Sequence, residues 1–341
     1  MERPEVLASI GERGLVRRIA ARAPTGPDTV LGIGDDAAAL QFSDSHLTVV
    51  STDRVPSDLI ALDLGVMNYS MLGRYIVEVN VSDIVAMGAK PSAFLLNLSL
   101  PSTTSVDQFE SLVDGVARRC EELSIGWIGG DCKRSDEPSF VGVAIGHALG
   151  AHLVCRDGAS PGDSVVVTGS LGACGAALMY FSRSDQSVSV SSATEETLLQ
   201  RLIEPVARLD LAGTLFSWAS ASMDITDGLG SSLLELAKAT NCAIEISAEA
   251  IPIHPAAEEV GELFGIEPLN FALGIGLDLE LLCTVGQGVT SPGVSIGTVS
   301  EGPSSESIIR SGGSSIHIGE GFEHFSRSAT DSIVGRENAR H

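Results

Sequence analysis

Apolar segments of strand length alternate with segments of helical periodicity along this chain, and the alternation runs twice. The first series ends near residue 149, and the turn-rich stretch RDGASPG at residues 156–162 separates it from the second. Such alternation is typical of layered α/β or α+β proteins, in which helices cover mixed sheets. We therefore predict two domains, at residues 1–150 and 151–325, followed by a polar tail at 326–341.

The apolar periodicity also predicts the individual elements. In the first half we expect helices at 4–22, 62–88 (one long helix or a pair) and 105–123, and strands at 46–51, 92–100, 125–128 and 140–149. In the second half we expect strands at 164–168, 222–225, 243–247, 279–285, 294–299 and 316–318, and helices at 173–181, 194–203, 207–219 and 228–240. The serine-rich stretch 182–196 is predicted to be a surface loop.

The composition excludes several classes of partner. The formal net charge is −23, and nucleic acids and anionic membranes both require basic surfaces. The six cysteines form no CxxC pair, which favours reduced thiols over disulfides or a zinc site. No apolar run is long enough to span a membrane, and the N-terminus lacks the order of a signal peptide. We expect a cytoplasmic protein without nucleic-acid or membrane partners.

Aspartates recur where apolar segments end, most of them beside glycine. The first pair, in LGIGDDAAAL, has no Lys or Arg within ten positions on either side. A single aspartate in such a context is commonly a turn or helix-cap residue, but the repetition favours a shared site. The set comprises Asp35, Asp36, Asp53, Asp83, Asp131, Asp224 and Asp227.

Several carboxylates can share one site only if they are protonated or bound to a cation. Oxygen-only ligands select hard ions, and Mg²⁺ typically bridges a carboxylate and a nucleotide phosphate. The chain has no Walker-A motif and no HRD and DFG pair of protein kinases. The stretch GSLGACG at 169–175 lacks the acidic partner of a dinucleotide fingerprint, so we interpret it as a tight strand–helix turn.

A family resemblance joins these motifs. IGDDAAAL, STD, VNVSDIVAMGAKP, IGGDCKRS, RDGASPGDSVVVTGSLG and MDITDGL stand in the order seen in thiamine-monophosphate kinases, which belong to the aminoimidazole ribonucleotide synthetase superfamily. The resemblance spans roughly residues 5–300. It implies a two-domain α/β fold with ATP and Mg²⁺ bound near a homodimer interface, which the N-terminal sheets close into a barrel. Residues 1–150 would then bind ATP and Mg²⁺ and dimerise.

The resemblance also assigns roles to particular residues. Asp35 resembles a metal ligand, and Asp36 a capping or supporting group beside it. Arg156 would contact ATP phosphate, Gly130 would lie near the nucleotide, and Thr226 would replace a serine of the family's D-x-S-D segment. Asp227 is the general-base candidate if the acceptor is a hydroxyl. The remaining metal-binding positions would be Ser51, Thr52, Asp53, Asp83, Asp131, Asp224 and Asp227, with Asp83 also counted as catalytic.

The positions expected to contact the phosphate acceptor, which we call the acceptor end, depart from the family pattern. Ile60 falls where the family has a histidine that helps to hold thiamine phosphate, and Leu277 replaces an acidic residue facing the substrate. Polar contacts of this kind contribute heavily to specificity, so their loss favours a changed acceptor over an inactive protein. A slip of one or two residues in the alignment, or compensation by other residues, is the alternative.

Three functional hypotheses follow. The first is a kinase that uses thiamine monophosphate or a related small acceptor, which can itself be phosphorylated. The second is an ATP-dependent synthetase or cyclase that activates an amide or carboxyl oxygen. The third is a non-catalytic nucleotide-binding partner protein. Among the remaining polar residues, we interpret His147, His152 and His254 as structural or surface residues. Lys133 and Arg134 face either phosphate or solvent.

Overall fold

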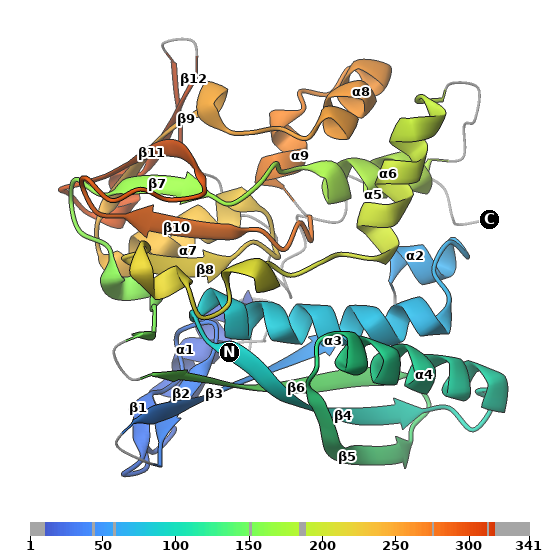
Figure 1. Ribbon diagram of the computed structural model, residues 1–341. Coiled ribbons are helices and arrows are strands. Elements are labelled where there is room, and N and C mark those ends of the chain that lie inside the picture. Colours follow the sequence, from blue (N-terminus) through green and yellow to red (C-terminus); the bar gives the residue numbers. More distant parts are fainter. Residues whose placement is uncertain are drawn as a thin grey trace, which may run out of the picture.

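A computed structural model describes residues 11–42, 45–56, 59–149, 152–183, 189–274, 276–311 and 314–317. Within these residues it contains two mixed β-sheets stacked one above the other, with helices between and around them (Figure 1). No helix among them is both long and apolar enough to cross a lipid bilayer. The predicted tail at 326–341 and the start of the helix predicted from residue 4 lie outside the described residues.

The first sheet consists, within the described residues, of six strands in the order β1-β2-β3-β6-β4-β5. Only β4 and β5 are parallel neighbours in it. The helices of this half include α3, which lies on one face of the sheet. The elements are α1 (Gly11–Ala20), β1 (Thr29–Leu31), β2 (Ala38–Gln41), β3 (His46–Val55), α2 (Ile60–Asp63), α3 (Tyr69–Ala86), β4 (Lys90–Leu100), α4 (Val106–Glu122), β5 (Gly126–Arg134) and β6 (Ser139–Leu149).

The second sheet has seven strands in the described part of the chain, in the order β13-β12-β9-β11-β7-β10-β8. Its helices are α5 (Ala173–Ser182), α6 (Ser192–Ile203), α7 (Leu229–Thr240), α8 (Pro255–Phe264) and α9 (Leu269–Leu273). Its strands are β7 (Ser164–Val167), β8 (Ala221–Asp224), β9 (Ala243–Ser247), β10 (Leu281–Val285), β11 (Val294–Ser300), β12 (Ile308–Ser311) and β13 (Ser314–His317). Short 3₁₀ turns are η3 (Arg156–Gly158), η4 (Leu209–Leu211), η5 (Leu215–Ser217), η6 (Ala248–Ala250) and η7 (Ser304–Glu306).

Helix α3 is the central element, because it packs against the first sheet below and the second half of the chain above (Figure 1). Its sequence is apolar on most sides, as expected of a helix buried all round. Val85 and Ala86 at its end pack into one apolar cluster with Val166 and Leu281 of the second sheet. The two halves therefore share a core, and residues carried by α3 face both of them.

Two glycines allow α3 and α4 to approach closely. A Cβ atom on Gly73 would lie 2.2 Å from the carbonyl oxygen of Leu112, and one on Gly115 would lie 2.0 Å from that of Ser70. Both contacts are with backbone atoms, which cannot move aside as a side chain would. Ser105 begins α4 with a capping box, in which its hydroxyl accepts from the N–H of Gln108.

The sequence located most elements but misjudged some. Residues 62–88 form a pair of helices, and the strand predicted at 125–128 extends to Arg134. The helix predicted at 207–219 was wrong: only η4 and η5 form there, because Gly213 adopts a left-handed conformation (φ 73°) and its N–H donates to Gly88 instead. Strands β1, β2 and β12 and helices α8 and α9 were not predicted.

Candidate metal and nucleotide site

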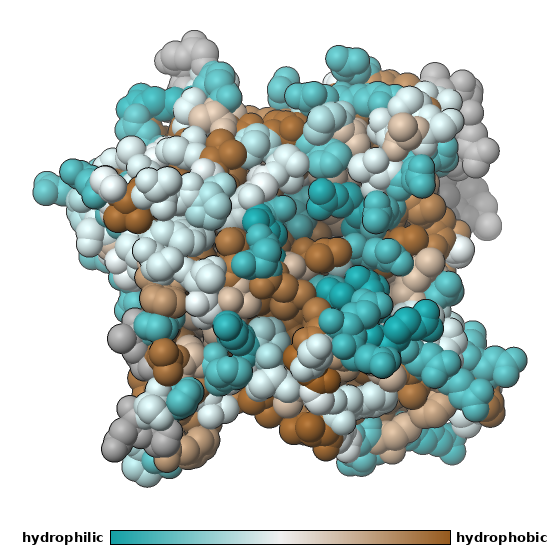
Figure 2. Space-filling view, in the orientation of Figure 1, coloured by the Kyte–Doolittle hydropathy of each residue, from teal (hydrophilic) through white to brown (hydrophobic). Residues whose placement is uncertain are grey.

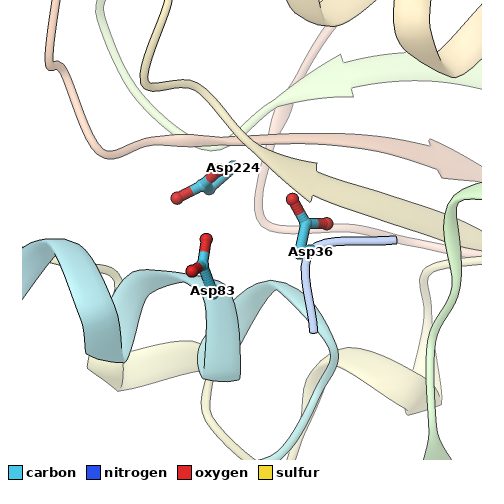
Figure 3. Close-up of side chains that lie close together, drawn as sticks. All are labelled: Asp36, Asp83 and Asp224. Carbon is cyan, nitrogen blue, oxygen red and sulfur yellow. The ribbon is translucent and has the colours of Figure 1, made fainter. Parts of the chain in front are cut away.

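Three aspartates from distant parts of the chain meet between the two halves. Asp36 lies in the turn before β2, Asp83 on α3 and Asp224 at the end of β8, and their side chains converge (Figure 3). One carboxylate oxygen of each lies within 4.8 Å of the others. A single cation can bridge carboxylates at this spacing. We refer to Asp36, Asp83 and Asp224 as the carboxylate cluster.

Burial makes charge on these carboxylates costly when no cation is bound. Burial raises the pKa of Asp224 to about 8, and the charge of Asp36 adds to the effect. Burial raises the pKa of Asp83 well above its ordinary value, and the nearby charges of Asp224, Asp53 and Asp36 act in the same direction. A divalent cation would remove this cost, so the residues present fit a hard metal ion such as Mg²⁺.

Serine hydroxyls orient two of the three carboxylates. Ser51 on β3 donates to Asp83, and Ser82 on α3 donates to Asp224 at 2.6 Å. Ser82 was not singled out from the sequence, although its position directly before Asp83 is the signal that could have found it.

Asn80 ties the strand that carries Ser51, Thr52 and Asp53 to helix α3. Its side-chain oxygen accepts from the N–H of Asp53 at 2.9 Å, and its amide donates to the carbonyl of Ile76 at 2.8 Å. Asn80 is fully buried. A Cβ atom on Gly142 of β6 would lie 2.2 Å from the Asn80 amide nitrogen, so the glycine makes room for this link. Sequence reasoning missed Asn80 as well.

The structure places the first two aspartates in different surroundings. Asp35 was predicted as the ligand, but its carboxylate accepts from the backbone N–H groups of Asp36 at 2.9 Å and Arg156 at 3.0 Å. Asp36 was predicted as a supporting group, but its carboxylate belongs to the cluster. Both carboxylates lie near Arg156, whose Nε is 3.7 Å from an Asp35 oxygen, and the role of Asp35 as a metal ligand stays a prediction. Burial raises the pKa of Asp35 to about 6, and the charge of Asp36 contributes.

Arg156 lies beside the cluster, where a phosphate contact was predicted. In the structure its guanidinium pairs with Asp36, and its Nε lies 3.3 Å from the second Asp36 oxygen. It thus supplies one fixed positive charge to a set of buried negative charges. Its partner here is a carboxylate, and its predicted contact with ATP stays a prediction.

Asp53 and Asp227 both lie close enough to Tyr75 on α3 to affect its pKa. Burial raises the pKa of Tyr75 on α3, and negative charge on Cys174, Asp53 and Asp227 acts in the same direction. Asp227 was alternatively interpreted as a helix cap, but the N-cap of α7 is Gly228, without a side-chain cap. Residue 276 pairs with Asp227 through an isolated backbone bridge, which brings Leu277 next to it. Thr226 lies between Asp224 and Asp227 and is half-buried.

Asp131 and Gly130 lie away from the cluster within one chain. Register places Asp131 opposite Asn97 of β4, and two strands (β4 and β6) separate β5 from β3. At the usual strand spacing this amounts to about 14 Å. Every residue of β5 is exposed, and the Asp131 carboxylate pairs with Lys133 at 3.0 Å. Within a single chain, Asp131 therefore lies too far from Asp83 for the two carboxylates to share a site as predicted.

The remaining predicted residues have local roles or lie at the acceptor end. Thr52 donates to the carbonyl of Gly142 at 2.9 Å. Ile60 begins α2, and Leu277 packs against the first apolar core. Asp278, next to Leu277, accepts from the N–H of Gly172 at 2.8 Å where α5 begins, so GSLGACG is the strand–helix turn predicted for it. His254 caps α8 by accepting from the N–H of Ala256 at 3.1 Å, as a structural residue.

Known protein families match both halves of this molecule. Residues 34–148 match the N-terminal domain, and residues 160–291 the C-terminal domain, of AIR synthase related proteins. The fold and the carboxylate cluster between its halves therefore define a two-domain protein of this class. The relatives within the class are more specific, and the chain belongs to the thiamine-monophosphate kinase family.

The individual relatives cover most of the chain. The thiamine-monophosphate kinase of Pyrococcus horikoshii is 32% identical over 256 residues, which are 74% of this chain and 77% of that protein. The enzyme of Escherichia coli is 32% identical, with 81% and 82% covered. Among solved structures, AaThiL complexed with AMPPCP and TMP aligns with a TM-score of 0.81 at 29% identity, covering 95% of this chain and all of that one.

Proposed function

We propose that this protein is an ATP-dependent kinase that phosphorylates thiamine monophosphate or a closely related small phosphorylated acceptor, with Mg²⁺ as its cofactor. The observation that carries the proposal is the carboxylate cluster of Asp36, Asp83 and Asp224, in a chain whose relative was crystallised with an ATP analogue and TMP. Buried carboxylates at this spacing suit a cation that accompanies a nucleotide. Relatives named for the same reaction support the choice of acceptor.

The chemistry requires positioning and charge rather than a covalent intermediate. An oxygen of the acceptor phosphate would attack the terminal phosphorus of ATP, the bond from that phosphorus to the bridging oxygen would break, and ADP would leave. When bound, Mg²⁺ would neutralise phosphate oxygens in the transition state. Asp36, Asp83 and Asp224 would hold it, and Ser51 and Ser82 would keep two of these carboxylates oriented.

Arg156 and Asp227 would act from either side of the cluster. The Arg156 guanidinium carries a permanent charge and lies against Asp36, from which it can reach a phosphate that enters the cluster. A phosphate acceptor needs no general base, so Asp227 would act as a base only for a hydroxyl acceptor. Asp53, Thr52 and Thr226 are proposed as further groups near metal or nucleotide.

We also propose that a homodimer completes the site. Asp131 and Gly130 lie on an edge strand whose Trp127 and Ile128 are exposed, and such a strand is a ready surface for a second copy. Asp131 would then serve the site of the partner chain.

We keep residues 1–150 as the nucleotide-binding and dimerisation domain and 151–325 as the second domain; the separation of the two sheets supports this division. The free state of all six cysteines supports a cytoplasmic location.

Product analysis tests the kinase proposal. Incubation with ATP, Mg²⁺ and thiamine monophosphate should yield ADP and thiamine diphosphate in equal amounts by phosphorus NMR. Asp83→Asn should abolish this turnover, whereas Asp114→Asn, at an exposed position of α4, should leave it unchanged. Free phosphate in place of a phosphorylated acceptor would instead identify a synthetase, and ATP binding without turnover a non-catalytic protein.

Mixing two variants tests the role of Asp131. Asp83→Asn and Asp131→Asn should each be inactive alone. If Asp131 of one chain serves the site that contains Asp83 of the other, mixed dimers contain one site with both changes and one intact site. Activity should then reappear after the two variants are unfolded together and refolded. Failure to recover activity in demonstrated mixed dimers would place both residues in the same chain's site or Asp131 outside any site.

A further inference from the structure

A pocket of about 310 Å³ lies at the junction of the two halves, next to the C-terminal end of α3. It is at the left-hand end of the lower sheet in Figure 1, where β3 begins and β6 ends. On the face drawn in Figure 2, hydrophobic residues also reach the surface between the two layers, so this junction is not sealed by polar side chains. We call it the junction pocket; its lining residues are His46, Gly88, Lys90, His147, Ala148, Leu149, His152, Gly213 and Phe216.

The charge of the junction pocket is opposite to that of the protein. The chain carries 44 acidic against 21 basic residues, yet the described residues that line the pocket include Lys90 and three histidines and no acid. The chain has seven histidines, so nearly half of them gather here.

Strand register builds this concentration of basic groups. Lys90 on β4 pairs directly with His147 on β6, and His46 on β3 pairs with Leu149, two positions further along β6. Paired residues on neighbouring strands point to the same face of a sheet, with Cβ atoms of direct partners about 5 Å apart. Lys90, His147 and His46 therefore project from one face at its end.

The second half of the molecule closes the junction pocket. A Cβ atom on Gly213 would lie 2.3 Å from Cε of Lys90, so the lysine stem runs across this glycine and its position is defined. The ring of His152 stacks on that of Phe216, with centroids 3.5 Å apart and planes 5° from parallel. No carboxylate of the described residues pairs with the Lys90 ammonium. The pocket thus combines a basic wall with a flat aromatic one.

We propose that the junction pocket is a second binding site, distinct from the carboxylate cluster, that takes the phosphate group of a small molecule. A phosphate presents several oxygens and needs donors from more than one direction, and the basic groups come from β3, β4, β6 and the segment after β6. A metal ion is not the occupant, because the three histidines do not converge as ligands among the described residues. This inference does not depend on the proposed kinase reaction.

The aromatic wall distinguishes two sources of the phosphate group. Inorganic phosphate would use the basic groups alone, whereas an organic phosphate monoester would also place its apolar part against His152 and Phe216. Because the lining residues come from both halves, occupancy would hold the halves together. Binding to the folded protein would then raise its melting temperature.

Anion binding can be measured without interference from the carboxylate cluster. In EDTA the cluster holds no cation that could bind phosphate, so phosphate binding that depends on Lys90 reports the junction pocket. We expect saturable binding of inorganic phosphate, one per chain, by calorimetry, with shifts of the His147 and His152 imidazole signals in NMR spectra. Phenyl phosphate that binds more tightly than inorganic phosphate, with the advantage lost in Phe216→Ala, would identify a monoester; equal affinity would identify free phosphate.

A matched pair of lysine variants decides the assignment. Lys90→Met keeps the aliphatic stem over Gly213 but removes the charge, and should weaken phosphate binding at least tenfold. Lys238→Met removes an equal charge from α7, where Lys238 pairs with Glu235, and should leave binding unchanged. Both variants should melt as the parent protein does in buffer without phosphate. Equal binding by the two variants, or no saturable binding in EDTA, would overturn the proposal.

A substitution tests the histidines separately. Since no acid lines the junction pocket among the described residues, the histidines and Lys90 are the basic groups that face it. His147→Gln should therefore weaken the binding of sulfate, another tetrahedral dianion, as well as that of phosphate. Unchanged affinity of His147→Gln for both anions would contradict a role for this imidazole.

Discussion

The guanidinium of Arg156 pairs with the carboxylate of Asp36, while the backbone N–H of the same arginine donates to Asp35 at 3.0 Å. Two adjacent carboxylates are thus held by one residue of the second half, through different atoms. Asp36 also belongs to the carboxylate cluster with Asp83 and Asp224. This arrangement assigns unequal roles to two residues that the sequence presents as equivalent.

Asp36→Asn and Asp35→Asn should therefore differ in their effect on catalysis. Asp36→Asn removes a charge from the carboxylate cluster, and we expect turnover to fall by at least about a hundredfold, with weaker Mg²⁺ binding. Asp35→Asn keeps an oxygen that can accept from the Arg156 N–H, so a loss of less than about tenfold is expected. Steady-state kinetics at varied Mg²⁺ concentration measures both. A larger loss in Asp35→Asn would restore the original assignment of Asp35 as the ligand.

The stability of the metal-free protein should fall as pH rises. An unfolded aspartate ionises near pH 4, whereas Asp224 in the folded protein retains its proton up to about pH 8, and the pKa of Asp83 is also raised. Between these values the native state binds more protons than the unfolded state, so each pH increment destabilises it. Melting temperatures in EDTA should therefore decrease from about pH 5 to pH 8.

Mg²⁺ should reverse that trend, because it replaces the proton on the carboxylate cluster and binds more tightly when the carboxylates are ionised. Asp224→Asn cannot ionise and should show a flatter dependence in EDTA. A matched series with Asp114→Asn, exposed on α4, should follow the parent protein. A metal-free protein whose melting temperature rises steadily over this range would contradict the raised pKa values.

A buried ion pair should contribute strongly to the stability of the first half. Glu78 on α3 is fully buried, pairs with Arg119 of α4 at 2.5 Å and accepts from the N–H of Ala207 at 3.0 Å. Arg119→Met would leave the Glu78 carboxylate buried with its main partner removed. We expect a loss of about 3–5 kcal/mol in the free energy of unfolding, measured with urea.

The control for this pair is Glu122, which also contacts Arg119 but is largely solvated. Glu122→Gln should cost less than about 1 kcal/mol. A replacement of both buried partners, Glu78→Leu with Arg119→Met, should recover part of the loss, since an apolar pair leaves no buried charge. Equal costs for the Arg119 and Glu122 variants would show that burial does not govern this network.

The acceptor end should respond to substitutions that restore polarity. Leu277 lies beside the residue that bridges to Asp227, and Ile60 begins α2. If these side chains have weakened the recognition of thiamine monophosphate, the double variant Ile60→His with Leu277→Glu should increase kcat/KM for that acceptor at least tenfold. The effect should be on the acceptor and not on the KM for ATP.

The parent protein provides the counter-test. A kcat/KM for thiamine monophosphate within the ordinary range of about 10⁴–10⁸ M⁻¹s⁻¹, together with a loss in the double variant, would show that the aliphatic residues are part of a competent pocket. Leu263→Glu, a similar change on α8, serves as a control for the general effect of an added carboxylate.

Much of the fold was predictable because burial imposes regular patterns on sequence. The stripe of α4 and the apolar run of β7 identified those elements. Residues 207–219 did not follow the prediction, since Gly213 bonds to Gly88 in the other half. Strands β1 and β2 were missed because strands of three and four residues with few buried side chains leave a weak periodic signal.

The amino-acid sequence by itself determined which residues carry the chemistry: aspartates where apolar segments end, with an arginine at the start of the turn-rich boundary, in the order of one enzyme family. Tertiary structure decided which of them meet. It brought Asp36 together with Asp83 and Asp224 across the two halves, and separated Asp131 by two strands. Local sequence specifies the type of side chain and its secondary structure, but side-chain direction in a turn and contacts between distant segments depend on how the sheets and α3 pack.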